Sequence, residues 1–429
     1  MGVGDRELGI GENVRRLLIA VPAVLAAVVL LPAPRRPVLV LPAGIVELHA
    51  EMNVEGEVRG APAGTVLRMA PDFAGRAALV VRGGEASLHD FSIEGNRDSR
   101  DIRSGLPPYD VPFAKFTRGN GILAEGIGGL TVERVAIRGI PGFAILASRA
   151  RHVFLDRVEV TGSGSRNPDG RNNATGGILL EEGTTDFRVT NCTLREILGN
   201  GIWTHSLYTS PRNGPGLIAN NGFETVGRDA IQVGHAFDVR VENNRGRTIG
   251  FPAGAVDATP AALDTSGNVE HSLYARNRFE QINGKCIDLD GFHDGEVRAN
   301  ACSGVGGYGI VFNNTNPDMQ SRGIRVVENR LENVMYGGIF VIGTGNLVAR
   351  NQLVNLNTSH CDGCGYVLGE PDMLDSGIYL GRKAERPAPA RGNVIEDNEI
   401  SGYKMTVRCV GHAPGIEAAW NVVRGNVCR

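Results

Sequence analysis

The sequence has no surplus of positive charge and few aromatic residues. Its formal net charge is −3 over 429 residues, whereas binding to DNA or RNA requires a basic stripe that neutralises phosphates. We therefore expect no nucleic acid as partner. Aromatic residues make up 6% of the chain, but glycine is abundant, with 59 residues. Many glycines without long helical patterns predict short strands joined by tight turns.

The sequence also lacks a second Cys-x-x-C pair beside Cys361 and Cys364. A structural zinc site needs about four ligands, so these two cysteines predict a local disulfide, and neighbouring His360 is not expected to bind metal. Cys302 and Cys428 occupy positions that are apolar in the other repeats, so we expect them to be buried thiols. No metal site is predicted from the cysteines.

One apolar run dominates the N-terminus. Arg15 and Arg16 precede the run Leu17–Leu31, a pattern that is typical of a signal peptide and short for a membrane span. No clean Ala-x-Ala cleavage site follows, so an uncleaved membrane anchor stays open as the alternative. We assign residues 1–35 to targeting and expect a secreted or periplasmic protein, bound to the membrane only if this segment is retained.

Internal repetition is the strongest signal in the remaining chain. A small residue followed by Ile or Leu returns at intervals of about 23 to 39 residues, as expected for coils with loops of varying length. The copies are Gly121-Ile122, Ala144-Ile145, Gly177-Ile178, Gly201-Ile202, Ala230-Ile231, Ala262-Leu263, Cys286-Ile287, Gly309-Ile310, Gly338-Ile339 and Gly377-Ile378, with Met405-Thr406 as a degraded last copy.

A second motif, an asparagine after a short apolar run, interleaves with the first. Its copies are Asn191, Asn221, Asn244, Asn277, Asn300, Asn329, Asn351, Asn398 and Asn426. If coils stack about 4.8 Å apart, each asparagine amide can donate to one neighbouring coil and accept from the other. The motif therefore predicts a structural asparagine ladder at a bend of the coil.

These two markers predict an all-β, right-handed parallel β-helix of roughly eleven or more coils. The asparagine ladder and the Gly-Ile bends resemble the pectate-lyase-like right-handed β-helix superfamily. The segments Val38–Gly44, Gly64–Arg68 and Leu88–Asn96 also look like the first coils of that superfamily. We assign residues 36–118 to an N-terminal cap with the first coils, and residues 119–429 to a β-helix with long loops. The resemblance specifies the fold, and it implies no single activity, because the superfamily includes lyases, hydrolases, epimerases and binding proteins.

Loop lengths predict where a cleft lies. Long polar insertions precede some Gly-Ile strands (residues 104–118, 161–175, 251–261 and 359–376) and follow others (residues 206–216, 314–323 and 382–391). Insertions on both sides of a strand border its outer face, so we expect a cleft over the sheet of Gly-Ile strands.

Strand alternation then identifies the residues on the floor of this cleft. The residue after each inward Ile or Leu faces outward, which gives Trp203, Gln232, Asp264, Asp288, Val311, Phe340 and Tyr379. Two positions further, a second outward column contains His205, Gly234, Ser266, Asp290, Asn313 and Ile342. His235, Lys285 and His293 are close in sequence, and Asp229 is expected to cap a turn.

Stacked carboxylates repel one another, which raises the pKa of one of them, and a pair of carboxyl groups is what sugar hydrolysis uses. The predicted catalytic residues are Asp264, Asp288, Asp290, His205 and His293. The predicted substrate-binding residues are Trp203, His235, Lys285, Asn313 and Tyr379, with the aromatic rings stacking on sugar faces. A lyase would instead use Ca²⁺ held by the three aspartates, with Lys285 or His293 as base.

We therefore expect an exported enzyme, hydrolase or lyase, that acts on a polysaccharide or oligosaccharide as a monomer. Calcium is the one cofactor that the aspartates suggest. The alternative is a non-catalytic exported β-helix that binds glycans or serves as a surface scaffold, because the sequence contains no recognised catalytic signature.

Overall fold

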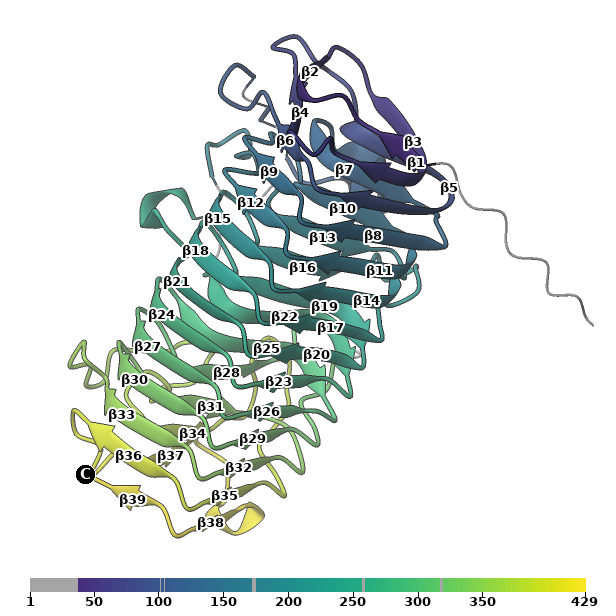
Figure 1. Ribbon diagram of the computed structural model, residues 1–429. Coiled ribbons are helices and arrows are strands. Elements are labelled where there is room, and N and C mark those ends of the chain that lie inside the picture. Colours follow the sequence, from purple (N-terminus) through teal and green to yellow (C-terminus); the bar gives the residue numbers. More distant parts are fainter. Residues whose placement is uncertain (1–37, 101, 104, 172–174, 257–258, 317–318) are drawn as a thin grey trace, which may run out of the picture. The chain divides into compact units, whose positions relative to one another are not determined.

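The computed structural model describes residues 38–100, 102–103, 105–171, 175–256, 259–316 and 319–429. It is a right-handed parallel β-helix, as predicted (Figure 1). Pro37–Arg429 forms one compact unit, and the targeting segment predicted for residues 1–35 lies outside the described residues. Among the described residues, no helix is long and apolar enough to cross a membrane.

Each coil contributes strands to three faces, which we call the site face, the second face and the third face. The third face is a 14-stranded parallel sheet. Its strands are β2 (Gly44–Leu48), β4 (Thr65–Met69), β6 (Ser92–Glu94), β9 (Ala136–Arg138), β12 (Glu159–Thr161), β15 (Thr193–Ile197), β18 (Gly222–Val226), β21 (Arg245–Ile249), β24 (Arg278–Ile282), β27 (Ala301–Val305), β30 (Arg330–Val334), β33 (Gln352–Leu356), β36 (Glu399–Gly402) and β39 (Val427–Cys428).

The site face holds the Gly-Ile strands. They are β7 (Asn120–Glu125), β10 (Ile145–Ser148), β13 (Ile178–Glu181), β16 (Ile202–His205), β19 (Ile231–Phe237), β22 (Ala261–Glu270), β25 (Lys285–His293), β28 (Ile310–Asn313), β31 (Ile339–Val341), β34 (Ile378–Leu380) and β37 (Val410–His412).

The second face follows the site face after a bend in each coil. Its strands are β8 (Gly129–Glu133), β11 (Arg151–Asp156), β14 (Thr185–Thr190), β17 (Gly216–Ala219), β20 (Val239–Glu242), β23 (Leu273–Ala275), β26 (Glu296–Arg298), β29 (Arg325–Val327), β32 (Leu347–Ala349), β35 (Val394–Glu396) and β38 (Val422–Arg424). These strands, those of the site face and the first strands β1 (Val38–Val40), β3 (Met52–Arg59) and β5 (Ala77–His89) together form one 25-stranded sheet, because several strands continue around the bend.

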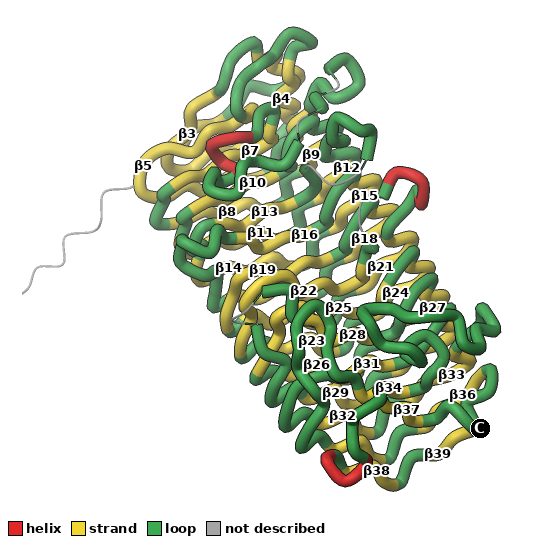
Figure 2. Tube along the Cα trace, turned by 180° about the vertical axis from the view of Figure 1, so that it is seen from behind, coloured by secondary structure: helices red, strands yellow, loops and turns green. Residues whose placement is uncertain are grey.

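The described helices are short: α1 (Phe113–Phe116) and the 3-10 turns η1 (Ala253–Ala255) and η2 (Ala418–Trp420). Helix α1 lies against β10 of the site face, where Figure 2 shows it in red beside the labels β7 and β10. The remaining connections are turns and loops, and this is why loop length rather than helix packing shapes the outer surface.

The inward Ile and Leu of the Gly-Ile motif form one stacked column, as predicted. Ile202 pairs with Ile231, Ile231 with Leu263, and Leu263 with Ile287 on successive coils. The column continues through Ile310, Ile339 and Ile378, all nearly inaccessible to solvent. In the copies that have glycine before Ile, a neighbouring backbone carbonyl lies close: a Cβ at Gly309 would meet the Gly338 oxygen at 2.2 Å.

The asparagine ladder is also present, and it runs from Asn221 to Asn426. The Asn277 amide donates to Asn300 Oδ1 at 2.9 Å, and the Asn300 amide donates to Asn329 Oδ1 at 3.0 Å. Each amide also donates to a carbonyl of the preceding coil, as Asn300 does to the Tyr274 oxygen at 2.9 Å. The ladder therefore satisfies buried polar groups at every bend that it crosses.

Two details of the repeat were predicted wrongly. The last strand of the site face is β37, which pairs with Ile378 through Val410, so Met405-Thr406 is not a copy of the motif. Asn191 lies outside the ladder: its exposed amide donates to Asp156, and the adjacent Cys192 backbone N–H donates to Asn221 Oδ1. A second, shorter ladder of Asn346, Asn393 and Asn421 supports the bend between the site and second faces.

Three disulfides connect Cys286 with Cys302, Cys361 with Cys364, and Cys409 with Cys428. The local Cys361–Cys364 pair was predicted, whereas the prediction of free thiols at Cys302 and Cys428 was wrong. Cys302 points inward from the third face and meets Cys286 from the site face across the core, with a Cα–Cα distance of 6.0 Å. Cys192 is buried and unpaired.

Candidate functional site

The strand register places the predicted acidic residues on one floor. On the site face, Trp203 pairs with Gln232, Gln232 with Asp264, and Asp264 with Asp288. In the second outward column, Ser266 pairs with Asp290, and Asp290 pairs with Asn313. Because side chains at paired positions of parallel strands stand side by side, the Asp264 and Asp288 carboxyl groups are neighbours on adjacent coils.

A chain of side-chain hydrogen bonds leads into this floor from the preceding turns. The Asn200 amide donates to Gln232 Oε1 at 2.6 Å, and the Gln232 amide donates to Asp264 Oδ2. Asn200 Oδ1 also accepts the backbone N–H of Asp229 at 3.2 Å. Asn200 thereby holds the Gln232 side chain in place, and Gln232 in turn orients Oδ2 of Asp264.

Burial and like charge shift the pKa of Asp264. Burial raises it well above the ordinary value, and the neighbouring carboxylates of Asp229 and Asp288 raise it further. Arg228 and Lys285 oppose this shift without cancelling it. Asp264 is therefore the carboxyl group of the cluster that is best placed to hold a proton near neutral pH.

Asp288 has the opposite surroundings. Its carboxylate forms an ion pair with the Lys285 ammonium group, and only 7% of the residue is exposed. Burial disfavours the charged amine, but Asp288 outweighs burial, so the pKa of Lys285 is raised. The second oxygen, Asp288 Oδ1, is buried and has no hydrogen-bond partner in the protein. This oxygen is free to accept a proton from a bound water or hydroxyl group.

Asp229 lies beneath the cluster and was not among the predicted site residues. As predicted, Asp229 lies in a turn, the one before β19. Its Oδ1 accepts the backbone N–H of Ala261 at 2.8 Å and so joins this turn to the next coil. Burial raises the pKa of Asp229, and Arg228, with Nε 3.5 Å from Oδ2, opposes that shift. Asp229 adds negative charge below Asp264, and Arg228 lies at the pocket edge.

Asp290 is held by a loop rather than left free. Its two oxygens accept the backbone N–H of Thr315 at 2.8 Å and the Thr315 hydroxyl at 2.7 Å. Burial raises its pKa despite these two bonds. Neighbouring Asn313 accepts the N–H of Asn314 at 2.8 Å. Both side chains therefore fix the start of the loop at residues 314–323, which borders the site.

His205 and Trp203 form one wall with Phe113 of α1. The ring centroids lie 5.0 Å apart for Phe113 and Trp203, and 5.1 Å apart for Trp203 and His205. Burial lowers the pKa of His205 to about 4, so its imidazole is neutral at pH 7. His205 Nδ1 is buried without a hydrogen-bond partner. Trp203 remains 8% exposed, which leaves only an edge of its ring in the pocket.

Three other predicted residues lie apart from the acidic cluster. His293 follows the bend of β25, and its ring nitrogens lie 2.8 Å from Asp294 Oδ2 and 2.9 Å from Asn268 Oδ1. His235 lies against Tyr208, with ring centroids 5.1 Å apart, and burial lowers its pKa. Tyr379 is 1% exposed, so its ring offers no face for a sugar.

A pocket of about 570 Å³ lies beside the cluster, and the three aspartates are not among its lining residues. The pocket is lined by Trp203, His205, Gln232 and Ser266 from the site face, by Arg228 from the turn before β19, by Phe113 of α1, and by residues 106–111 and 206–209 from two loops. Gln232 and Ser266 connect it to the acids, since Gln232 bonds to Asp264 and Ser266 pairs with Asp290.

The long loops border this pocket on both sides, as predicted. On the carboxyl side, the Asn316 amide donates to the Tyr208 hydroxyl at 2.5 Å and so joins the loop at residues 206–216 to the loop at residues 314–323. On the amino side, Arg171 Nη1 donates to the Val256 carbonyl at 3.2 Å. Figure 2 shows long loops in green beside β25, β28 and β31.

Among the described residues, the one group of three side chains whose ligand atoms all lie within 4.8 Å of one another is Glu181, Glu182 and His205. Glu181 already accepts two backbone N–H groups of α1, and Glu182 accepts the Leu207 N–H and the Ser210 hydroxyl. Asp264, Asp288 and Asp290 do not converge in this way, and the Lys285 ammonium group among them repels a cation. The donor set therefore does not favour the predicted calcium ion.

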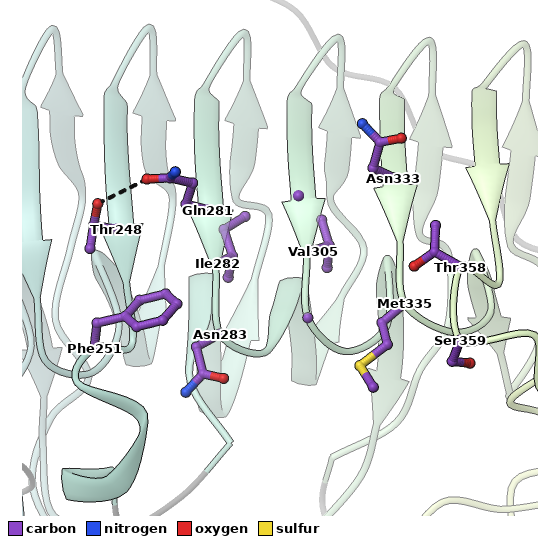
Figure 3. Close-up of a pocket in the computed structure, with 12 residues that line it drawn as sticks. Thr248, Phe251, Gln281, Ile282, Asn283, Val305, Asn333, Met335, Thr358 and Ser359 are labelled. Carbon is purple, nitrogen blue, oxygen red and sulfur yellow. Dashed lines mark hydrogen bonds between the residues drawn. The ribbon is translucent and has the colours of Figure 1, made fainter.

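A second groove, of about 660 Å³, lies where third-face strands turn towards the site face. Phe251 and Met335 border it, with Asn283 between them (Figure 3). The Thr248 hydroxyl bonds to Gln281 Oε1 at 3.2 Å along one edge. All of its lining residues are uncharged, so this groove has no group suited to acid–base chemistry.

No family model matches the chain, and no curated protein sequence matches it. Among solved structures, the catalytic domain of a GH87 α-1,3-glucanase in complex with tetrasaccharides has a TM-score of 0.56 and 14% identity, over 91% of this chain and 64% of that one. The domain in complex with nigerose gives a TM-score of 0.53 and 14% identity, over 90% and 64%. DFA-IIIase from Arthrobacter chlorophenolicus A6 gives a TM-score of 0.48 and 14% identity, over 90% and 88%.

The chain thus spans slightly less than two thirds of the glucanase chains that it matches. At these identities the likeness concerns the fold alone, a right-handed parallel β-helix. The chemistry of this chain must be argued from its own site residues.

Proposed function

We propose that the protein is a glycoside hydrolase, with Asp264 as general acid and Asp288 as general base or nucleophile. The observation that carries this proposal is the contrast between two neighbouring carboxyl groups. Burial and negative neighbours favour a proton on Asp264, whereas Asp288 forms an ion pair with a lysine. Paired acids in contrasting environments are the arrangement that acid–base chemistry on a glycosidic bond uses.

In the proposed reaction, Asp264 donates its proton to the glycosidic oxygen as the bond from that oxygen to the anomeric carbon breaks. A water molecule supplies the new hydroxyl group on the anomeric carbon. In an inverting reaction, the proton of this water passes to the Asp288 carboxylate. In a retaining reaction, Asp288 first forms a glycosyl-enzyme ester, and the proton of the water that hydrolyses it returns to Asp264. The net reaction consumes one water and leaves both sugars with free hydroxyl groups. Gln232 positions Asp264 without touching the reacting atoms.

A lyase is the weaker candidate. It would require a neutral lysine or another free base near the uronate carbon, and the pKa of Lys285 is raised, so this amine is protonated at neutral pH. Both ring nitrogens of His293 are hydrogen-bonded outside the acidic cluster. Carbohydrate as the substrate class has further support, because the GH87 α-1,3-glucanase domain with the same fold was solved with tetrasaccharides and with nigerose.

The test is a screen of the purified protein on neutral and uronate polysaccharides, with and without Ca²⁺. New reducing ends without ultraviolet absorption are expected from a hydrolase. An unsaturated product that absorbs in the ultraviolet would replace this proposal with a lyase. Binding without any cleavage would favour the non-catalytic alternative.

Export to the periplasm or the medium is part of the proposal. Three disulfides support it, because such bonds persist in oxidising compartments. Fractionation of the producing cells tests it: recovery of the protein with all three disulfides reduced in the cytosol would contradict export.

A further inference from the structure

The outward column of the site face is covered on the N-terminal side of the pocket. A hydrophobic cluster separate from the main core buries its residues under the loop that contains α1. The cluster comprises Ala77, Val80, Phe113, Ala114, Leu123, Phe143, Leu146, Leu179 and Trp203. Leu123, Leu146 and Leu179 occupy the same outward position as Asp264 on earlier coils.

A buried carboxylate holds this cover in place. Glu181 lies on β13 of the site face, and its two oxygens accept the N–H groups of Phe113 at 2.9 Å and Ala114 at 2.8 Å. Glu181 is fully inaccessible to solvent. Displacing α1 would strand a buried carboxylate without partners, which is costly, so the cover is a fixed part of the fold.

The same column is covered on the C-terminal side. Val311, Phe340 and Tyr379 continue the line of Asp288 and are at most 2% exposed. Glu370 from the loop at residues 359–376 is also fully buried, and its Oε1 accepts the N–H groups of Arg382 at 2.7 Å and Lys383 at 3.0 Å. Two loops are thereby tied together over this end.

A third contact ties the C-terminal cover to the carboxyl-side rim. The Arg386 N–H donates to Asn314 Oδ1 at 3.0 Å, and the Asn314 amide donates to the Arg386 carbonyl at 3.1 Å. The floor between the two covers is therefore limited to the positions from Gln232 to Asp288. At a coil spacing of about 4.8 Å, these three stacked positions span on the order of 10 Å, the length of about two sugar rings.

We infer that this pocket is closed at both ends along the helix axis and accepts the end of a glycan chain or a short oligosaccharide, not an internal segment of a polymer. The inference rests on the proposed glycosidase function and specifies its substrate. An internal segment would have to continue past the acids in both directions. One direction meets Phe113 and the cluster below it, and the other meets the cover over Phe340 and Tyr379.

The experiment compares one polysaccharide in two forms, native and chemically blocked at both chain ends, with the purified protein. The expected result is release of one short product from the native polymer from the first time points, with slow loss of viscosity and no cleavage of the blocked form. Random internal products, fast loss of viscosity, or equal cleavage of the blocked polymer would overturn the inference while leaving the glycosidase proposal intact. No cleavage of any glycan would instead remove the glycosidase proposal and, with it, this inference.

A variant sharpens the test. Phe113→Ala removes the ring that a glycan chain would meet on the N-terminal side, while the backbone N–H groups that bond to Glu181 remain. We expect this variant to gain internal cleavage of the blocked polymer. If the folded variant still cleaves chain ends alone, the cover at this side does not determine the mode of action.

Discussion

The outer surfaces of the site face and the third face have the same strand geometry but opposite electrostatics. On the third face, Glu224 forms ion pairs with Arg247 and Arg195, all three side chains are exposed, and hydrogen bonding to Arg247 is the main reason that the Glu224 pKa is lowered. On the site face, Asp264 and Asp290 are partly buried, and burial raises the pKa of both. Outward acidic residues on strands of the same geometry therefore have their pKa values shifted in opposite directions, according to what surrounds them.

This contrast follows from where the long insertions leave the coil. Third-face strands begin at the tight asparagine bends that follow the second face, without long insertions there, and their carboxylates, such as that of Glu224, meet water and neighbouring arginines. Site-face strands are flanked by loops that exclude water, and a charge in such surroundings interacts more strongly with its neighbours. Exposed ion pairs are expected to contribute little to stability, whereas buried acids cost stability, and groups with such shifted pKa values cluster at functional sites.

The largest difference between the two faces should appear in activity. Asp264→Asn removes the proposed general acid and should lower kcat by about 10²–10⁴-fold on whichever glycan the wild type cleaves. Asp288→Asn should have an effect of similar size. Glu224→Gln, the matched change on the third face, should leave kcat/KM unchanged. Full activity in both aspartate variants would remove these residues from catalysis and make His205 the next candidate.

The inward side of the same site-face strand should determine stability instead. Ile287 lies next to Asp288 in sequence but faces the core and is inaccessible to solvent. Ile287→Ala leaves a cavity and should lower the free energy of unfolding by about 2–4 kcal/mol, measured by urea titration. Asp264→Asn serves as the control, since an amide can still accept the bond from Gln232. A loss of stability as large as that of Ile287→Ala in this control would mean that the floor is a structural network.

Much of the fold could be predicted because the repeat is local. Ile202, Ile231, Leu263 and Ile287 were placed in one stacked column from spacing alone, and this register determined that Asp264 and Asp288 are side by side. Strand alternation needs no knowledge of distant residues. The failure at Met405-Thr406 arose because a two-residue motif is weak where loop length varies, and β37 begins instead at Val410.

The rest of the site depends on contacts between distant segments. Asn200 and Asp229 lie in turns outside the outward columns, so alternation gave no reason to select Asn200 and suggested only a turn cap for Asp229. The burial of Tyr379 depends on the loop that carries Glu370. The Tyr379 hydroxyl donates to Glu370 Oε2 at 3.4 Å. The cover by α1 depends on Glu181, 67 residues from Ala114. Pattern alone does not fix the path of a long loop.

The two types of bend asparagine allow a smaller and cleaner comparison. Asn300→Ala removes amide bonds to Asn329 and to the Tyr274 carbonyl, and it leaves buried partners unpaired. The free energy of unfolding should fall by about 1–3 kcal/mol, measured by chemical denaturation. Asn191→Gly, at an exposed position outside the ladder whose positive φ of 56° glycine adopts freely, should change it little. Equal effects of both variants would contradict the assignment of the ladder as a buried network.

The smallest expected effect concerns the pH dependence of stability, which should have opposite signs for the two faces. The folded pKa of Asp264 is raised above its ordinary value of 3.8. Protonated Asp264 therefore contributes its full stabilisation below pH 3.8. This contribution is lost as the pH rises through the pKa that Asp264 has in the folded protein. Glu224 has a lowered pKa, so its contribution is present above 4.5 and is lost as pH falls, and its exposure keeps it small.

Asp264→Asn should therefore unfold at nearly the same temperature as the wild type near pH 4. Its melting temperature should rise relative to that of the wild type as the pH is raised towards 7, because the amide never has to carry a buried charge. Glu224→Gln should show no such rise. Calorimetric melting curves of the three proteins across this range measure the difference. A melting temperature of Asp264→Asn that falls relative to the wild type with rising pH would show that the Asp264 carboxylate is stabilised in the folded protein, and Asp264 would then lose its role as the proton donor.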